Sequence, residues 1–195
     1  MLDLRGRNRI APFLDPIAAG LAKIRLTPTS VTILGLVVTI AGSVLIANRE
    51  YTWGAIVAGF GGFLDALDGP LARLKGVASN RGAFIDTMAD RFGEIAIFTA
   101  LAFARRTDPT ALMLCLLGLA FSLLTPYVRA KAESWGAEGR GGWMGRAERM
   151  LLILLGVGLE GVGLPTLLAT LWILVVLSGL TVGQRIRRTW QQLDA

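Results

Sequence analysis

The chain contains no histidine, a single cysteine and few charged residues, which make up 17% of its 195 positions. A soluble domain would have about 25% charged residues. With no second cysteine, an intramolecular disulfide is excluded, and Cys115 lies in an apolar stretch that indicates a packing role. The apolar residues, 53% of the chain, occur in blocks rather than in helical or strand-like alternation. This pattern favours a protein that spans a membrane.

Six apolar blocks are candidate spans, since about 20 residues cross roughly 30 Å of hydrocarbon and glycines can extend a packed membrane helix. The blocks cover approximately residues 30–48, 53–72, 83–104, 110–130, 149–160 with the glycine-rich stretch that follows, and 164–184. Residues 1–26 have apolar side chains at roughly helical spacing, with Arg and Lys between them, and lack the uninterrupted apolar core of a signal peptide. We therefore expect an all-α integral membrane protein, with an N-terminal amphipathic surface helix (1–26) and one domain of six transmembrane helices (27–195).

The basic residues are distributed unevenly between the two sides of the expected bundle. With both termini on one side, 16 of the 20 Lys and Arg residues fall on that side. The positive-inside rule then predicts a multi-pass protein of the cell membrane with both termini in the cytoplasm. A net charge of +6 can also indicate nucleic-acid binding. The basic residues lie between apolar blocks rather than along one exposed face, which argues against that function.

Four aspartates interrupt the apolar pattern where the second and third spans meet: Asp65, Asp68, Asp86 and Asp90. A carboxylate at membrane depth costs several kcal/mol unless it is paired, solvated or bound to a cation. The spacings i, i+3 and i, i+4 place each pair on one helix face, and a short loop joins the two antiparallel helices. All four carboxylates should therefore converge near the cytoplasmic side. Oxygen ligands without His or Cys favour Mg²⁺, Mn²⁺ or Ca²⁺ over zinc.

Two other interpretations of these aspartates are open. They could form salt bridges with Arg73, Arg81 and Arg91, but three guanidinium groups do not easily neutralise four mutually repelling carboxylates. They could also bind the ion of a non-enzymatic cation transporter. Such sites commonly lie near the midplane between repeated halves, and no internal repeat is visible here. A metal site fits the pattern best.

The aspartates belong to a longer motif, Asp65-x2-Asp68-Gly69-x2-Ala72-Arg73-x8-Gly82-x3-Asp86-x3-Asp90. It resembles the signature of the CDP-alcohol phosphotransferase family at all eight fixed positions and every spacing. The resemblance implies a metal-dependent enzyme that transfers a phosphatidyl group from CDP-diacylglycerol, or a similar CDP-lipid, to an alcohol and releases CMP. It further implies that Asp65, Asp68 and Asp86 hold two ions, Mg²⁺ or Mn²⁺. Asp90 would contribute a ligand and act as general base.

The same resemblance assigns CDP-lipid contacts to two stretches. One lies just before the first span and comprises Pro28, Thr29, Ser30 and Val31; the other lies in and near the motif and comprises Gly69, Ala72, Arg73, Ser79 and Gly82. Small residues let a nucleotide approach the backbone, and the planar guanidinium of Arg73 suits a diphosphate. Helix packing explains the two glycines equally well, and is compatible with ligand binding.

The acceptor alcohol must be inferred from the second half of the chain. Tyr127–Glu133 and Arg146–Arg149 are similar to segments of the bacterial phosphatidylinositol-phosphate synthase subfamily. This resemblance implies inositol 1-phosphate as the acceptor, with its phosphate bound by three arginines. These are Arg129, Arg149 and Arg185.

Alternatives remain for the acceptor and for the assembly. The three arginines are also explained as positive-inside residues, and the subfamily's Glu-Arg-x-Glu-Arg has Gly145 in place of its first Glu. Glycerol 3-phosphate, the acceptor of a phosphatidylglycerophosphate synthase, is the main competitor. Relatives in the family suggest a homodimer, and the small residues of the spans are compatible with a dimer and with a monomer.

Overall fold

The computed structural model of the chain describes residues 14–23 and 26–193, and within them every regular element is a helix. Residues 14–23 are helical, and seven further helices follow in chain order. They are α2 (Pro28–Ala47), α3 (Tyr51–Asp65), α4 (Asp68–Lys75), α5 (Asn80–Ala104), α6 (Pro109–Ser134), α7 (Arg146–Gly161) and α8 (Leu167–Leu193). The expected all-α class is confirmed.

Four stretches in the described part of the chain are long and apolar enough to cross a membrane. They are Pro28–Ala47, Tyr51–Lys75, Pro109–Ser134 and Leu167–Leu193. The other two predicted spans correspond to α5, which has several charged residues in its first half, and to α7, which has only 16 residues. Large apolar side chains such as Val37, Phe60 and Trp172 are about half exposed, as expected for surfaces that face lipid. The chain is therefore a membrane protein.

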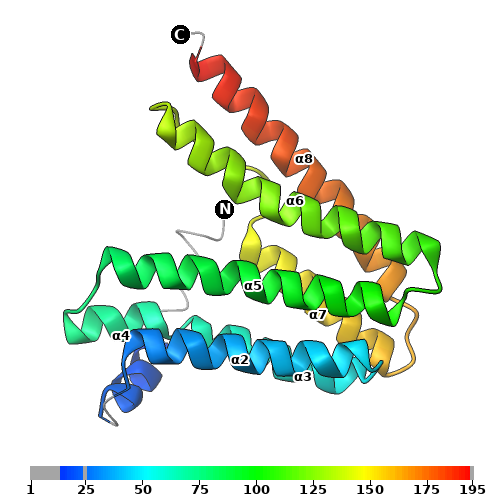
Figure 1. Cartoon of the computed structure of the whole chain (residues 1–195), viewed down its shortest axis with the longest axis horizontal. Coiled ribbons are helices and arrows are strands. Elements are labelled where there is room, and N and C mark those ends of the chain that lie inside the picture. The colour runs from blue at the N-terminus through cyan, green and yellow to red at the C-terminus, as the bar shows by residue number, and fades with distance from the viewer. Residues whose placement is uncertain (1–13, 24–25, 194–195) are drawn as a thin grey trace.

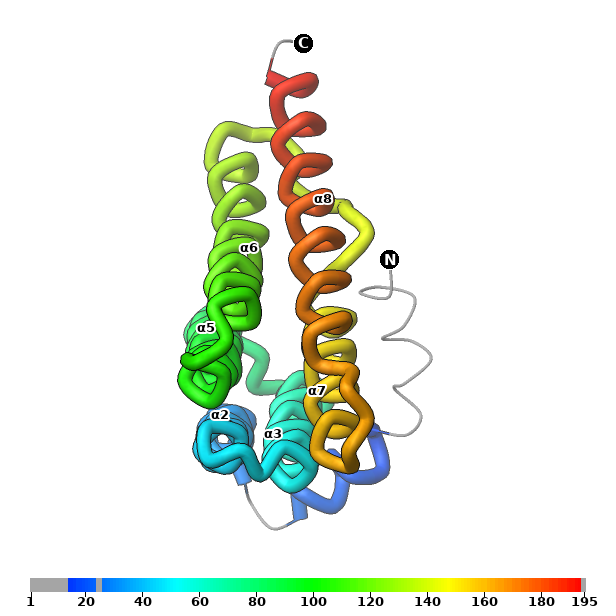
Figure 2. The backbone as a smooth tube through the Cα atoms, turned by 90° about the vertical axis from the view of Figure 1, so that its right-hand side faces the viewer, coloured from blue at the N-terminus to red at the C-terminus, as the bar shows by residue number. Residues whose placement is uncertain are grey.

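Six of the helices form a closed ring. Following the contacts around it, α2 packs on α3, α3 on α7, α7 on α8, α8 on α6, α6 on α5, and α5 again on α2. In Figure 1, α2, α3 and α5 run roughly parallel while α6 and α8 run diagonally beside each other. Figure 2 shows α2 and α3 nearly end-on, with α6 and α8 extending lengthwise above them. In this order α5 and α7 occupy opposite positions, so a contact between their side chains must cross the interior of the ring.

The core of the ring is apolar over most of its length. Its buried side chains come from all six ring helices and include Ile46, Ala58, Phe98, Leu101, Leu114, Ile153, Leu171 and Leu174. A second, smaller cluster lies at the end where the chain begins: Ala18 of the 14–23 helix packs with Val31 of α2 and Leu71 of α4. Of the predicted surface helix at 1–26, residues 1–13 and 24–25 lie outside the described residues.

One ion pair ties α5 to α7 at the end of the ring away from the aspartates. Arg105, just after α5, pairs with Glu160 in the last turn of α7. Glu160 also accepts a hydrogen bond of 2.9 Å from the backbone N–H of Leu167, the first residue of α8. The carboxylate thus fixes the α7–α8 connection and links it to α5.

The second predicted span, 53–72, is interrupted between α3 and α4. Pro70 lacks the N–H that would bond the carbonyl of Ala66, and its ring would clash with that carbonyl in a continuous helix. Accordingly α3 ends at Asp65, and α4 starts at Asp68. The interruption places Asp65 at the end of one helix and Asp68 at the start of the next, so the two side chains do not follow the geometry of one continuous helix.

Glycines let α2 and α3 approach each other closely. A Cβ atom at Gly42 would lie 2.4 Å from the backbone nitrogen of Ala58, and one at Gly61 would lie 2.6 Å from the carbonyl oxygen of Gly35. Backbone atoms cannot move aside as a flexible side chain can, so these glycines are required by packing. A Cβ atom at Gly62, the next residue of α3, would have no heavy atom within 4 Å.

The pair Gly61 and Gly62 provides a test of this packing. Gly61→Ala should lower the free energy of unfolding by about 1–3 kcal/mol, because it overpacks the α2–α3 contact. Gly62→Ala should leave stability unchanged or raise it by up to about 1 kcal/mol, because alanine is the better helix former. Thermal unfolding in detergent measures both, and equal melting temperatures for the two variants would contradict the close approach.

Candidate active site

Three of the four predicted carboxylates gather where α3 ends and α4 begins. One oxygen from each of Asp65, Asp68 and Asp86 lies within 4.8 Å of the others, and the three side chains are half-buried. Asp86 is in the second turn of α5, which packs beside α2. Thr32 of α2 donates a hydrogen bond of 2.5 Å to Asp68 Oδ2 and holds that carboxylate in place. We call these three residues the acidic triad.

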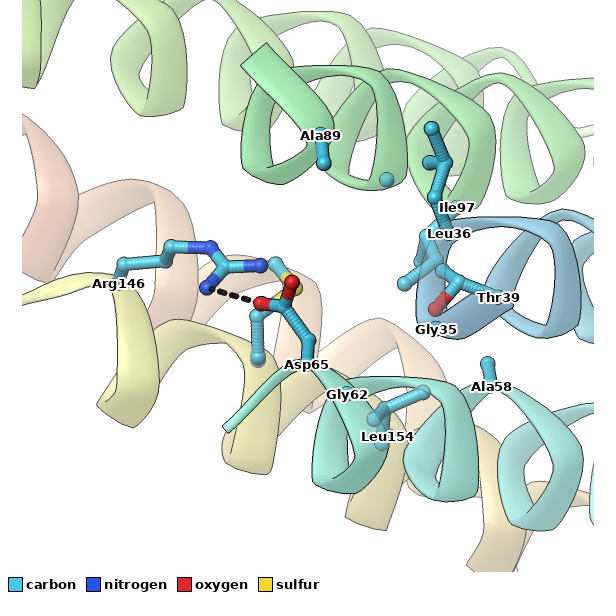
Figure 3. Close-up of a pocket in the computed structure, with 12 residues that line it drawn as sticks. Gly35, Leu36, Thr39, Ala58, Gly62, Asp65, Ala89, Ile97, Arg146 and Leu154 are labelled. Atoms are coloured by element: carbon cyan, nitrogen blue, oxygen red, sulfur yellow. Dashed lines mark ion pairs between the residues drawn. The ribbon is translucent and has the colours of Figure 1, made fainter. Parts of the chain in front are cut away.

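The fourth carboxylate, Asp90, points to an arginine instead. Arg146, the first residue of α7, places Nη1 2.5 Å from Asp90 Oδ1 and 3.6 Å from Asp65 Oδ2. Figure 3 shows this side chain reaching Asp65 at the edge of a small cavity that lies between α2, α3, α5 and α7. Arg91 lies farther from Asp90, at 3.9 Å. The sequence assigned no site role to Arg146, and only its place in the Glu-Arg-x-Glu-Arg-like segment pointed to it.

One turn deeper, Glu94 carries a carboxylate that is fully buried. It pairs with Arg91 of the same helix and accepts a bond of 2.9 Å from Nη2 of Arg149 on α7, whose side chain is 1% exposed. Asp86, Asp90 and Glu94 follow at intervals of four residues, so they share one face of α5. The spacing i+4 from Asp90 was the signal that sequence reasoning missed. Removing either partner of such a buried pair leaves an uncompensated charge.

These contacts form a continuous series of ion pairs across the interior of the ring. It runs from Asp65 through Arg146, Asp90, Arg91 and Glu94 to Arg149, with three carboxylates alternating with three guanidinium groups. Charges of opposite sign in a poorly solvated interior interact strongly, and each one lowers the cost of burying its neighbours. The series connects the acidic triad to the centre of the molecule.

A proline in α6 provides an acceptor for this series. Pro126 has no N–H, so the carbonyl of Ser122, four residues earlier, has no helical partner. Arg91 Nη1 lies 3.4 Å from that oxygen and donates to it. One turn later, Arg185 Nη1 of α8 donates to the carbonyl of Thr125 at 2.9 Å. The kinked part of α6 therefore receives guanidinium groups from both α5 and α8.

Of the three arginines predicted to bind the acceptor phosphate, Arg129 and Arg185 lie at this part of α6, and Arg149 lies on α7. Arg129 follows Thr125 by one turn and pairs with Glu133 at 2.9 Å. Arg185 donates from Nε to the carbonyl of Gly141 at 2.9 Å, in the loop before α7. Arg149 contacts Glu94, while its Nε and Nη1 are enclosed and have no hydrogen-bond partner among the described residues. Each of the three arginines already has a protein partner.

The predicted CDP-lipid contacts lie at the starts of two helices near the triad. Thr27 caps α2 by accepting from the backbone N–H of Ser30 at 3.1 Å, so Pro28, Thr29, Ser30 and Val31 form the first turn. Ser79 caps α5 by accepting from the N–H of Gly82 at 3.2 Å. Helix N-termini carry unpaired N–H groups and a partial positive charge, which suit phosphate oxygens. Because Thr32 bonds Asp68, the α2 start lies beside the triad.

The remaining predicted contacts come from α4. Gly69 and Ala72 are partly exposed, and Arg73 is exposed, as is Ser79 in the connection to α5. Val31 is the exception among all these residues, because its side chain is buried in the smaller apolar cluster. At Gly82 a Cβ atom would meet only Ser79 Oγ, at 3.5 Å, which is an ordinary contact. Protein packing therefore does not require glycine at this position.

The donor set of the triad fits a hard divalent cation. Carboxylate oxygens are the ligands that Mg²⁺, Mn²⁺ and Ca²⁺ prefer, and neither His nor Cys is close in the described part of the chain. Three half-buried carboxylates within 4.8 Å also repel one another, so a cation stabilises their approach. The arrangement is suited to binding a diphosphate through a metal ion.

Comparisons with known proteins agree with this geometry. Residues 25–183 match the family model for CDP-alcohol phosphatidyltransferase. The phosphatidylinositol phosphate synthase of Mycobacterium marinum is 36% identical over 193 residues, which cover 94% of this chain and 82% of the relative. The crystal structure of the Mycobacterium tuberculosis phosphatidylinositol phosphate synthase with CDP-DAG bound has a TM-score of 0.84 and 34% identity, covering 91% of this chain and 93% of that one.

A second crystal structure of the Mycobacterium tuberculosis enzyme, in complex with manganese and citrate, is equally similar. Its TM-score is 0.84 at 34% identity, and the match covers 91% of this chain and 88% of that one. The manganese in that relative and the acidic triad of this chain both indicate a dependence on divalent metal. From the matched family model and these relatives, the chain belongs to the CDP-alcohol phosphatidyltransferase family.

Proposed function

We propose that this protein transfers the phosphatidyl group of CDP-diacylglycerol to inositol 1-phosphate, giving phosphatidylinositol phosphate and CMP. The observation that carries the proposal is the acidic triad, held where α3 breaks into α4, with Arg146 paired to Asp65. Its chemistry suits a diphosphate donor and a phosphorylated acceptor. The two similar enzymes named above are phosphatidylinositol phosphate synthases, which supports this choice of acceptor.

The proposed mechanism gives each carboxylate a role. Asp65, Asp68 and Asp86 would hold two Mg²⁺ or Mn²⁺ ions, with Asp90 as a further ligand. Bound ions of this kind polarise a diphosphate and neutralise the charge that develops on the leaving group. Asp90 takes the proton of the acceptor hydroxyl, the hydroxyl oxygen forms a bond to the lipid-bearing phosphorus, and the bond from that phosphorus to the CMP oxygen breaks.

Substrate binding would use the surrounding helix ends and cations. The first turn of α2, the start of α5 and Arg73 are proposed to bind the nucleotide and its phosphates. Arg129, Arg149 and Arg185 are proposed to bind the acceptor phosphate; the contact of Arg185 with Thr125, one turn before Arg129 on α6, supports this for two of them. A dianionic acceptor needs several cationic donors of this kind.

The proposal includes the way the chain lies in the membrane. All six ring helices cross it as the domain 27–195, with α5 and α7 enclosed by more apolar neighbours, and residues 1–26 lie on its surface. The basic residues favour a cytoplasmic active site and cytoplasmic termini. A homodimer is proposed on the family resemblance alone. Membership of a transferase family argues against the cation transporter considered above.

One observation favours a second acceptor. Gly145 replaces the first glutamate of the inositol-type segment, so the part of the acceptor region next to Arg146 differs from that pattern. Glycerol 3-phosphate also has a phosphate for the arginines, and the protein would then be a phosphatidylglycerophosphate synthase. Because both acceptors are phosphate esters, the arginines cannot distinguish them by charge.

Acceptor choice is testable directly. Purified protein with CDP-diacylglycerol and Mg²⁺ should release CMP when inositol 1-phosphate is added, and much less with glycerol 3-phosphate. CMP release is followed by chromatography, and the lipid product by mass spectrometry. Turnover with glycerol 3-phosphate alone would replace the inositol assignment by the second acceptor.

The role of Asp90 is tested by substitution with asparagine. Asp90→Asn keeps the shape but removes the base, so the rate of CMP release should fall by roughly 10²–10⁴-fold. Asp108→Asn is the matched control, because Asp108 caps α6 at the opposite end of the ring and asparagine caps equally well. Equal rates for the two variants would rule out Asp90 as the base.

Metal dependence is tested by chelation. Treatment with EDTA should abolish CMP release, and added Mg²⁺ or Mn²⁺ should restore it, because the triad offers only carboxylate oxygens. Turnover that persists in membranes stripped of divalent ions would contradict the proposed mechanism. The same samples, assayed before and after restoration, serve as their own control.

A further inference from the structure

Arg146 contacts two carboxylates that the proposed mechanism assigns to metal ions. A single nitrogen, Nη1, lies 2.5 Å from Asp90 Oδ1 and 3.6 Å from Asp65 Oδ2. The triad of Asp65, Asp68 and Asp86 is assembled within 4.8 Å without Asp90. The triad can therefore hold one cation without Asp90, whereas any position that needs Asp90 is shared with the guanidinium.

A guanidinium and a divalent ion cannot both use these oxygens fully. An Mg²⁺ ion binds carboxylate oxygens at about 2.0–2.1 Å, and a guanidinium bonded to the same oxygen would bring a second positive charge within a few ångströms. At that separation in a poorly solvated site, the repulsion between cations is large. Entry of an ion at Asp90 must therefore displace the Arg146 side chain.

Arg146 is the arginine of this region that is free to leave. Its side chain is 34% exposed, whereas Arg149 is 1% exposed and Arg91 is 19% exposed. Arg91 and Arg149 are both bonded to the buried Glu94, so their displacement would leave that carboxylate uncompensated. Arg146 Nε has no hydrogen-bond partner among the described residues, and the ion pairs at Nη1 hold the side chain.

We infer that Arg146 is a resident counter-ion of Asp90 and Asp65 and that the second metal ion must displace it. The two ion positions therefore fill in order. The first ion binds to the triad with Arg146 in place, and the second binds once Arg146 has moved away from Asp90. This inference rests on the proposed two-ion centre. It makes Arg146 a positioning residue that sets the difference in affinity between the two ions.

Ion binding can be counted without turnover. Purified full-length protein in detergent is titrated with Mn²⁺, and free Mn²⁺ is measured by electron paramagnetic resonance. We expect two ions per chain, with the second bound at least tenfold more weakly. In Arg146→Gln the second Mn²⁺ ion should bind at least tenfold more tightly than in the unmodified protein. The dissociation constant of the first ion should change less than threefold. Arg146→Lys, which keeps the charge but not the planar fork, should give an intermediate shift.

Arg105→Gln is the matched control. It makes the same change to an α5–α7 ion pair, with Glu160, at the opposite end of the ring. Its two dissociation constants should equal those of the unmodified protein. If both Arg146 variants bind two ions with unchanged dissociation constants, the displacement of Arg146 by the second ion is overturned, while the two-ion centre is retained. A single ion in every protein would overturn the two-ion centre and the exchange with it.

Discussion

The arrangement of this protein depends on neutralising carboxylates inside a membrane bundle. Asp86, Asp90 and Glu94 lie along one face of α5, and hydrocarbon cannot solvate them. Arg146 and Arg149 of α7 supply the compensating charges from the opposite side of the ring. Because a guanidinium side chain is long enough to cross the interior, the charges meet at the centre, and both helices are held in one register.

This constraint explains why α5 and α7 differ from the other ring helices. Their faces toward the interior are charged, so α5 is less apolar than a lipid-facing span, and the four most hydrophobic stretches belong to the other helices. Close glycine contacts hold α3 against α2, which also packs on α5, and the break before Pro70 lets Asp68 reach Thr32. The acidic triad results from these two local features acting together.

The sequence allowed part of this site to be predicted. The i, i+3 and i, i+4 spacings predicted that carboxylates of two helices would converge, and three of them do so in the acidic triad. The pairing of Asp90 with Arg146 could not be predicted, because it depends on how α7 lies across the ring from α5. The spacing of four residues from Asp90 could have pointed to Glu94, but its pairing with Arg149 of α7 could not be predicted from one helix. Long-range register carries this information, and spacing along one helix does not contain it.

The ion pair between Arg105 and Glu160 has a mechanical consequence. Together with the pair of Glu94 and Arg149 it joins the middle and the end of α5 to the two ends of α7, so sliding one helix along the other by a turn would strand several charges at once. The two ion pairs therefore oppose sliding of α5 along α7. At the aspartate-bearing end α6 and α8 are joined separately, by the hydrogen bond from Arg185 to the carbonyl of Thr125.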